Sequence, residues 1–125
     1  MQRSSIIAAI TAIAVGLVAL QYWNATRPKP APLPSLVRDL PKDVKAAQWE
    51  FGERVGKRFP AGSPSEAVTR ELSAEGFHIE AMNGRWQAAS LTRMLYPCTI
   101  TWRVRWRSEA GKVVGILTAY RLACP

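Results

Sequence analysis

The side chains that most often perform catalysis are scarce in this chain of 125 residues. Its only histidine, His78, has no second histidine or free cysteine to complete a set of metal ligands. Glu71 and Glu75 stand one helical turn apart, a spacing that can pair two carboxylates for acid–base chemistry but is also routine on the exposed flank of a helix. We therefore expect a protein without enzymatic activity, metal or cofactor.

Cys98 and Cys124 can form a disulfide bond, and the surrounding pattern predicts that they meet. Apolar and polar residues alternate along residues 98–107, which predicts a strand, and residues 113–124 return after a turn centred on Gly111. A disulfide is favoured in a small exported chain and would contribute roughly 3.5 kcal/mol by the chain-entropy model. Two buried unpaired thiols are the alternative. The same register pairs Trp102 with Tyr120 and Ile100 with Leu122.

Arginine side chains gather on the outer face of this predicted hairpin. Arg103, Arg105 and Arg121 project away from Trp102 and Trp106, because neighbouring residues of a strand point to opposite faces. Guanidinium groups bind carboxylates and phosphates through paired hydrogen bonds, so the cluster suits an acidic protein surface, anionic lipid headgroups or a cell-wall polymer. The alternative is a solvated face that charge keeps soluble.

The positive charge of the chain is unevenly distributed. Its net charge is +8, and from residue 82 onward seven basic residues stand against Glu109 alone. Residues 42–81 are close to neutral. The C-terminal part should therefore attract acidic partners.

Two helices are predicted ahead of the strands. Apolar residues recur at steps of three or four along residues 43–59, which predicts an amphipathic helix. Trp49 lies off its apolar stripe and is either an interface anchor or partly buried under the preceding linker. Ser63 as an N-cap and Gly76 at the end indicate a second helix over residues 64–75.

A further hairpin is predicted between the helices and the cysteine-bearing strands. Asn83-Gly84 suits a two-residue turn between strands at residues 77–82 and 85–90. The predicted fold class is therefore α+β, with two helices packed on a four-stranded antiparallel sheet. Counting outward from the turn places Ile79 opposite Ala88 and gives one buried face of Phe77, Ile79, Ala81, Trp86, Ala88 and Ser90.

The N-terminus carries an uncharged apolar run, residues 6–20, that continues to Tyr22 and Trp23. As a helix this segment is roughly 27 Å long, enough to cross a thin bilayer. The aromatic pair suits a membrane interface and no clear cleavage site follows, which favours a signal-anchor over a cleaved export signal. We expect a transmembrane signal-anchor at residues 1–26, a proline-rich linker too irregular to join the core at 27–42, and an extracytoplasmic domain at 43–125.

The predicted domain resembles a known helix–helix–sheet unit. The segment AGSPSEAVTRELSAEGF, residues 61–77, is similar in Gly62-Ser63, Val68, Leu72 and Gly76 to the beta-lactamase inhibitor protein and the SmpA/OmlA (BamE-like) outer-membrane assembly lipoproteins. The resemblance covers about residues 43–124 and implies a scaffold whose sheet or loops grip another protein. The chain lacks the lipid-bearing cysteine of the assembly lipoproteins, and no binding residue is carried over.

These features predict a single-pass protein of the inner (cytoplasmic) membrane, with its C-terminal domain in the periplasm or outside the cell. There it would bind another envelope protein or membrane complex through Arg103, Arg105, Arg121 or Trp49. Nucleic acid is not an expected partner in that compartment. The alternatives are a periplasmic inhibitor or immunity protein that blocks a hydrolase, and a module that binds anionic lipid or cell-wall polymer.

Overall fold

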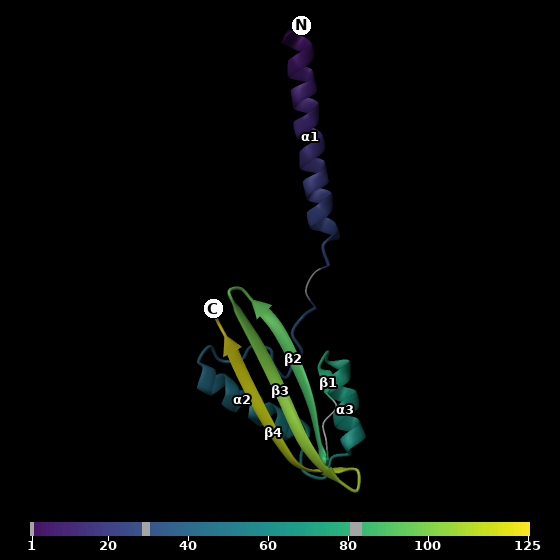
Figure 1. Ribbon diagram of the computed structural model, residues 1–125, viewed down its shortest axis with the longest axis vertical. Helices are drawn as coiled ribbons and strands as arrows, with labels where there is room; N and C mark the ends of the chain where they lie inside the picture. Colours follow the sequence, from purple (N-terminus) through teal and green to yellow (C-terminus); the bar gives the residue numbers. More distant parts are fainter. Residues whose placement is uncertain (1, 29–30, 81–83) are drawn as a thin grey trace. The chain divides into compact units, whose positions relative to one another are not determined.

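The computed structural model describes residues 2–28, 31–80 and 84–125, which fall into two compact units, Met1–Pro32 and Leu33–Pro125. The first unit contains α1 (Gln2–Thr26), and the second contains two further helices and four strands (Figure 1). α1 has 25 residues and a mean hydropathy of 2.0 over its apolar stretch. By length and composition it can cross a membrane.

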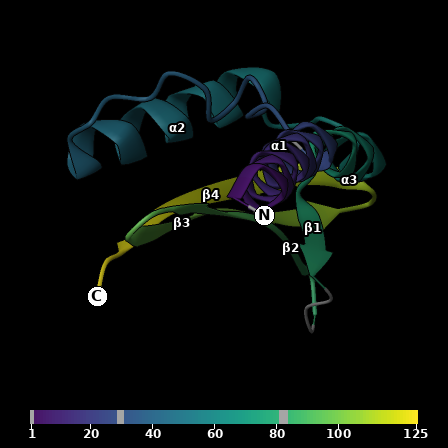
Figure 2. The same ribbon diagram turned by 90° about the horizontal axis from the view of Figure 1, so that it is seen from above.

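The second unit is an antiparallel sheet with helices on one face. Its helices are α2 (Val44–Arg58) and α3 (Ser65–Ala74), and its strands are β1 (His78–Glu80), β2 (Trp86–Leu95), β3 (Cys98–Glu109) and β4 (Lys112–Ala123). The strands lie in the order β1-β2-β3-β4. Figure 2 shows α2 and α3 on the same side of the sheet, and they pack against β4 and β1 respectively. The predicted α+β class, with two helices on a four-stranded antiparallel sheet, is confirmed.

The hairpin of β3 and β4 has the predicted register up to Arg107, and a β-bulge between Arg107 and Ser108 shifts the pairing by one residue nearer the turn. A disulfide joins Cys98 to Cys124 at its open end. At the closed end Ala110 and Gly111 have φ values of 52° and 75°, the left-handed conformation that a two-residue hairpin turn requires at both positions. The predicted pairs are present, Trp102 with Tyr120 and Ile100 with Leu122.

The hairpin of β1 and β2 differs from the prediction by one residue. Ile79 lies opposite Ala89, whereas counting from the expected turn placed it opposite Ala88. β2 also continues to Leu95, five residues beyond the expected end. Residues 81–83, which include Asn83 of that turn and the predicted buried position of Ala81, lie outside the described residues.

This shift corrects the predicted faces of β2, because a slip of one residue turns every side chain to the other face. Ala89 lies opposite Val104 and Leu91 opposite Trp102, and all four belong to the buried cluster. Trp86, predicted to be buried, is therefore on the opposite face of the sheet. The alternation of apolar and polar residues in β3 determines which side chains of β2 face the core, because paired residues share a face. The prediction had used only the number of residues from the Asn83-Gly84 turn.

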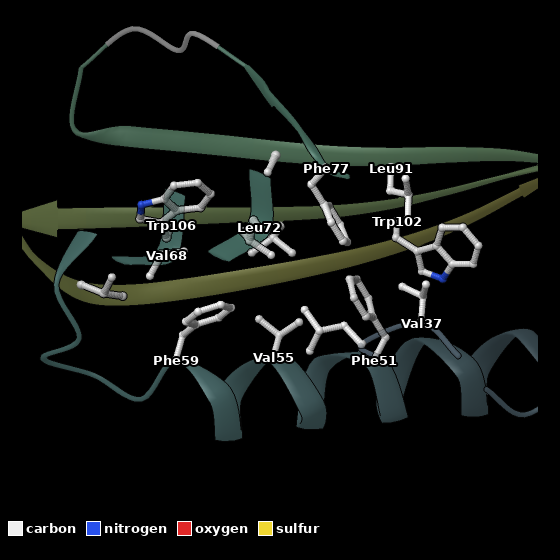
Figure 3. Close-up of a cluster of buried hydrophobic side chains, with 14 of the residues drawn as sticks. Val37, Phe51, Val55, Phe59, Val68, Leu72, Phe77, Leu91, Trp102 and Trp106 are labelled. Atoms are coloured by element: carbon white, nitrogen blue, oxygen red, sulfur yellow. The ribbon is translucent and has the colours of Figure 1, made fainter. Parts of the chain in front are cut away.

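The core lies between α2, α3 and the inner face of the sheet (Figure 3). α2 begins after Asp43, whose carboxylate accepts a hydrogen bond from the N–H of Ala46 and so caps the helix. Four of the five residues of the stripe expected on this helix are almost completely buried, Ala47, Phe51, Val55 and Phe59, whereas the first, Val44, is 40% exposed.

Residues 33–42, expected to lie in an extended spacer outside the core, pack on the domain, and we call this segment the strap. Leu36 and Val37 are only 3% and 2% exposed and belong to the hydrophobic cluster. Pro34 does not keep the chain extended, because its carbonyl oxygen accepts hydrogen bonds from the N–H groups of Val37 and Arg38. The resulting turn brings two aliphatic side chains onto the sheet.

An arginine of α2 ties the strap down. Arg54 donates hydrogen bonds to the carbonyl oxygens of Ser35 and Arg38, and it also pairs with Glu50 one turn earlier in the helix. The compact unit consequently starts at Leu33, ten residues before the boundary expected from the sequence.

The start of α3 also differs from the prediction. The helix begins at Ser65, and no side chain caps it. The hydroxyl of Ser63, predicted to be the cap, donates instead to the carbonyl oxygen of Pro60 at 2.6 Å. The backbone of Ser63 is held by β4, because its carbonyl oxygen accepts a hydrogen bond from the N–H of Val113.

Candidate functional site

The face of the sheet opposite the helices carries the arginines that the sequence singled out. Trp102 and Val104 point into the core, so Arg103 and Arg105 between and beside them point the other way. Arg121 lies opposite Thr101 and joins them on this face. We call this surface, which no element of the second unit covers in Figures 1 and 2, the open face.

Arg103 is held in place by an acidic neighbour. Its Nη2 lies 2.9 Å from Oε2 of Glu80 on β1, and the hydroxyl of Ser90 donates to the other carboxylate oxygen at 2.9 Å. This network spans β1, β2 and β3. The charge of Arg103 is therefore largely balanced by Glu80. Its contribution is to link β3 to β1, the strand at the far edge of the sheet.

Arg105 lies against an aromatic ring instead of a carboxylate. Its Cζ is 6.0 Å from the ring centre of Trp86, a cation–π arrangement that orients the guanidinium group and leaves its hydrogen-bond donors exposed. Arg107 lies opposite Trp86 in the next strand. Arg105, Arg107 and Arg121 are all exposed, and within the described part of the chain none of them forms an ion pair.

Trp49 stands in a different environment. It is 66% exposed on α2, so the strap does not bury it. It borders a shallow groove of about 450 Å³, together with Lys45, Gln48, Gly52, Glu53 and Thr118. Thr118 belongs to β4, which places this groove along the line where α2 meets the last strand.

The arginines and Trp49 do not share one surface. Trp49 is on the helix layer, and Arg105, Arg107 and Arg121 are on the opposite side of the sheet. β4 is the strand that both regions border, because Thr118 lines the groove and Arg121 lies three residues further along. A ligand that contacts both regions has to lie along the outer edge of β4.

The carboxylates considered for acid–base chemistry are engaged in ion pairs. Arg58 contacts both Glu71, at 3.6 Å, and Glu75. The hydroxyl of Ser35 in the strap also donates to Glu75, at 3.1 Å. His78 is exposed on β1. Within residues 2–28, 31–80 and 84–125, no three residues of the His, Cys, Asp and Glu types lie close enough to hold a metal ion.

Sequence reasoning missed three members of the open face. Trp86 was assigned to the core, and Arg107 and Leu117 were not considered as binding residues. Leu117 is 49% exposed and lies opposite Arg105. These three residues could have been found from the alternation of β3. Residues opposite each other in adjacent strands share a face, so the faces of β3 also assign the residues paired with it in β2 and β4.

A scan against known protein families, a search of characterised proteins and a search of solved structures each found no match to this chain. The function proposed below therefore rests on the sequence and the structure of the chain itself.

Proposed function

We propose that this chain is a non-enzymatic accessory protein, tethered to the inner membrane by α1, whose extracytoplasmic domain binds an acidic surface of another cell-envelope protein. The observation that carries the proposal is the open face, where Arg105, Arg107 and Arg121 are exposed without a carboxylate partner among the described residues. Arginine is enriched at protein interfaces because its planar group binds carboxylates through two hydrogen bonds.

Two features support the compartment. α1 is apolar enough to act as a signal-anchor, and the only two cysteines of the chain form a disulfide. Structural disulfides persist in oxidising compartments and are rare in the cytosol. An N-terminal anchor followed by a disulfide-bonded domain is the arrangement expected of a protein whose domain has been exported.

The test compares partners recovered with tagged full-length protein from solubilised membranes, identified by mass spectrometry. The test variant combines Arg105→Ser, Arg107→Ser and Arg121→Ser with Trp49→Ala. Arg103 is retained, because its loss would leave Glu80 without its ion-pair partner. We expect a specific partner of the unmodified protein to be recovered at least about tenfold less with this variant, as lost charge-assisted contacts imply.

A matched control removes the same number of positive charges elsewhere. Lys42, Lys57 and Arg70 are exposed and lie outside the open face, so their replacement by serine should leave the partner in place. Equal loss with both variants would show that only net charge matters, and unchanged recovery with the test variant would refute the proposal.

The second candidate, a periplasmic inhibitor or immunity protein, is favoured by the independence of the compact unit Leu33–Pro125, which has its own core and its own disulfide. Inhibition of a hydrolase needs no membrane span. If the secreted fragment starting at Leu33 protects cells as well as the full chain does, this candidate replaces the accessory protein; if protection or partner binding requires α1, it is excluded.

A further inference from the structure

β4 is an edge strand, and only its first residues are paired on the outer side. The loop before α3 covers that start: the N–H of Gly62 donates to the carbonyl oxygen of Val113 at 2.8 Å, and the N–H of Val113 donates to Ser63 at 2.9 Å. The N–H of Ser65 donates to Gly111 at 2.8 Å. These bonds extend the sheet by one short segment and then stop.

From residue 116 to residue 123, beyond a β-bulge that shifts the pairing with β3 between Val113 and Gly115, the outer edge of β4 is open. In the described part of the chain, the backbone hydrogen bonds of this stretch all go to β3. Alternate residues of an edge strand direct both N–H and C=O away from the sheet, so a row of backbone donors and acceptors is exposed here. Proteins commonly protect such edges with proline or with several charges, but this stretch contains no proline and one charged residue, Arg121.

The two candidate binding regions lie on either side of this edge. On the helix side, Trp49 and Thr118 border the groove of about 450 Å³. On the other side are Arg121 and, one strand further in, Arg105 and Arg107. A strand added to β4 would alternate its side chains between these two environments, because successive residues point to opposite faces.

We propose that the outer edge of β4 binds an extended segment of the partner as a fifth strand, with acidic residues at alternate positions and apolar residues between them. The acidic side chains would face Arg105, Arg107 and Arg121, and the apolar ones would contact Trp49. This inference rests on the proposed function and specifies the chemistry of the partner. It accounts for a large exposed aromatic side chain and three unpaired arginines through one ligand.

Charge selects a foreign acidic strand over a second copy of the same chain. Two copies joined through β4 would each bring Arg121, Arg105 and Arg107 to the new sheet, and the chain has a net charge of +8. Like charges on neighbouring strands destabilise a sheet. An acidic segment would instead place negative charges beside these arginines, so the interaction between the neighbouring strands would be attractive.

The experiment uses full-length protein in nanodiscs of zwitterionic lipid and a short fluorescent peptide that alternates glutamate with valine. Its dissociation constant is measured by fluorescence anisotropy and compared with that of a peptide alternating lysine with valine. We expect binding of the glutamate peptide and at least about tenfold weaker binding of the lysine peptide, as charge complementarity requires. Absence of binding by the glutamate peptide would overturn the inference.

Variants locate the peptide on the protein. Trp49→Ala and the combined replacement of Arg105, Arg107 and Arg121 by serine should each weaken binding about tenfold. The combined replacement of Lys42, Lys57 and Arg70 by serine removes the same number of charges as the arginine variant, and as its matched control it should leave binding unchanged. Self-association of the nanodisc-embedded protein that competes with the peptide would assign the edge to a second copy and overturn the inference.

N-methylation of the peptide distinguishes strand pairing from contact with the arginines alone. Two peptides carry N-methyl groups at alternate residues, in the two possible phases. A peptide paired to β4 turns only one set of N–H groups toward it, so one phase should abolish binding and the other should preserve it. Equal binding of both phases would refute strand addition while leaving the proposed acidic partner of the open face intact.

Discussion

At the scale of single residues, Ser65 has a structural role that its place at a helix start does not suggest. It is 7% exposed, and its hydroxyl accepts a hydrogen bond from Nε1 of Trp106 at 3.0 Å while donating to Oε1 of Gln87 at 2.7 Å. Trp106 is completely buried, so its indole N–H has no access to water. One hydroxyl therefore joins α3, β2 and β3.

We expect Ser65→Ala to lower the free energy of unfolding by about 1–3 kcal/mol, because it leaves a buried N–H without its acceptor. The measurement is urea unfolding of the full chain in detergent, followed by tryptophan fluorescence. Ser73→Ala, an exposed position of the same helix, serves as the control and should change stability by less than about 0.5 kcal/mol. Equal stability of the two variants would mean that the Trp106 hydrogen bond is dispensable.

The tryptophans show how far single residues could be predicted from the sequence. Trp102 and Trp106 were correctly placed in the core, because β3 alternates without interruption. Trp49 was correctly placed off its helical stripe. Trp86 was misplaced, because its face depends on pairing with β3, and short-range counting from a turn cannot detect a one-residue slip.

At the scale of elements, the packing of α2 on β4 depends on a glycine. A Cβ atom built on Gly52 would lie 2.9 Å from Oγ1 of Thr118, whereas one built on Gly56 would meet nothing within 4 Å. Both glycines weaken the helix by about 1 kcal/mol relative to alanine. Only at Gly52 does a neighbouring side chain, Thr118, leave too little room for a Cβ atom.

We expect Gly56→Ala to raise the free energy of unfolding by about 0.5–1 kcal/mol, through helix propensity. Gly52→Ala should be less favourable than Gly56→Ala by about 1 kcal/mol or more, because the helix or Thr118 must move. Thermal and urea unfolding of both variants test this difference. Adding Thr118→Ala to Gly52→Ala should remove most of this difference in the free energy of unfolding. If the difference persists, the contact with Thr118 is not its cause.

Local signals explain which elements could be predicted. The apolar stripe of α2 and the alternation of β3 and β4 are periodic over many residues, so the elements and the Cys98–Cys124 pairing followed from them. The strap could not be predicted, because Leu36 and Val37 lie in a proline-rich stretch whose burial depends on Arg54, a residue distant in sequence. On the open face, Arg103, Arg105 and Arg121 were recognised from the alternation of β3 and β4. Trp86 was not, because β2 acquires its faces from β3.

At the scale of the whole molecule, the disulfide closes the sheet where β3 begins and β4 ends. It joins residues 26 positions apart, and the chain-entropy model gives a contribution of about 3.5 kcal/mol for a loop of this size. We expect the double variant Cys98→Ser, Cys124→Ser to lose about that amount in urea unfolding without reductant. Unmodified protein treated with dithiothreitol should match the variant; a loss below about 1 kcal/mol would show that strand pairing alone secures this end.

Because the strap packs on the domain, the linker between α1 and the domain is reduced to residues 27–32. However those residues are arranged, six residues span at most about 20–22 Å when fully extended. With α1 in a bilayer, the domain would be confined to a thin layer above the lipid, and a target in the same membrane would meet it at an effective concentration far above its bulk value. A contact too weak to persist between free molecules would then be strong enough to hold the two proteins together in the membrane. Cleavage of the linker should abolish their association even if every residue of the domain is intact.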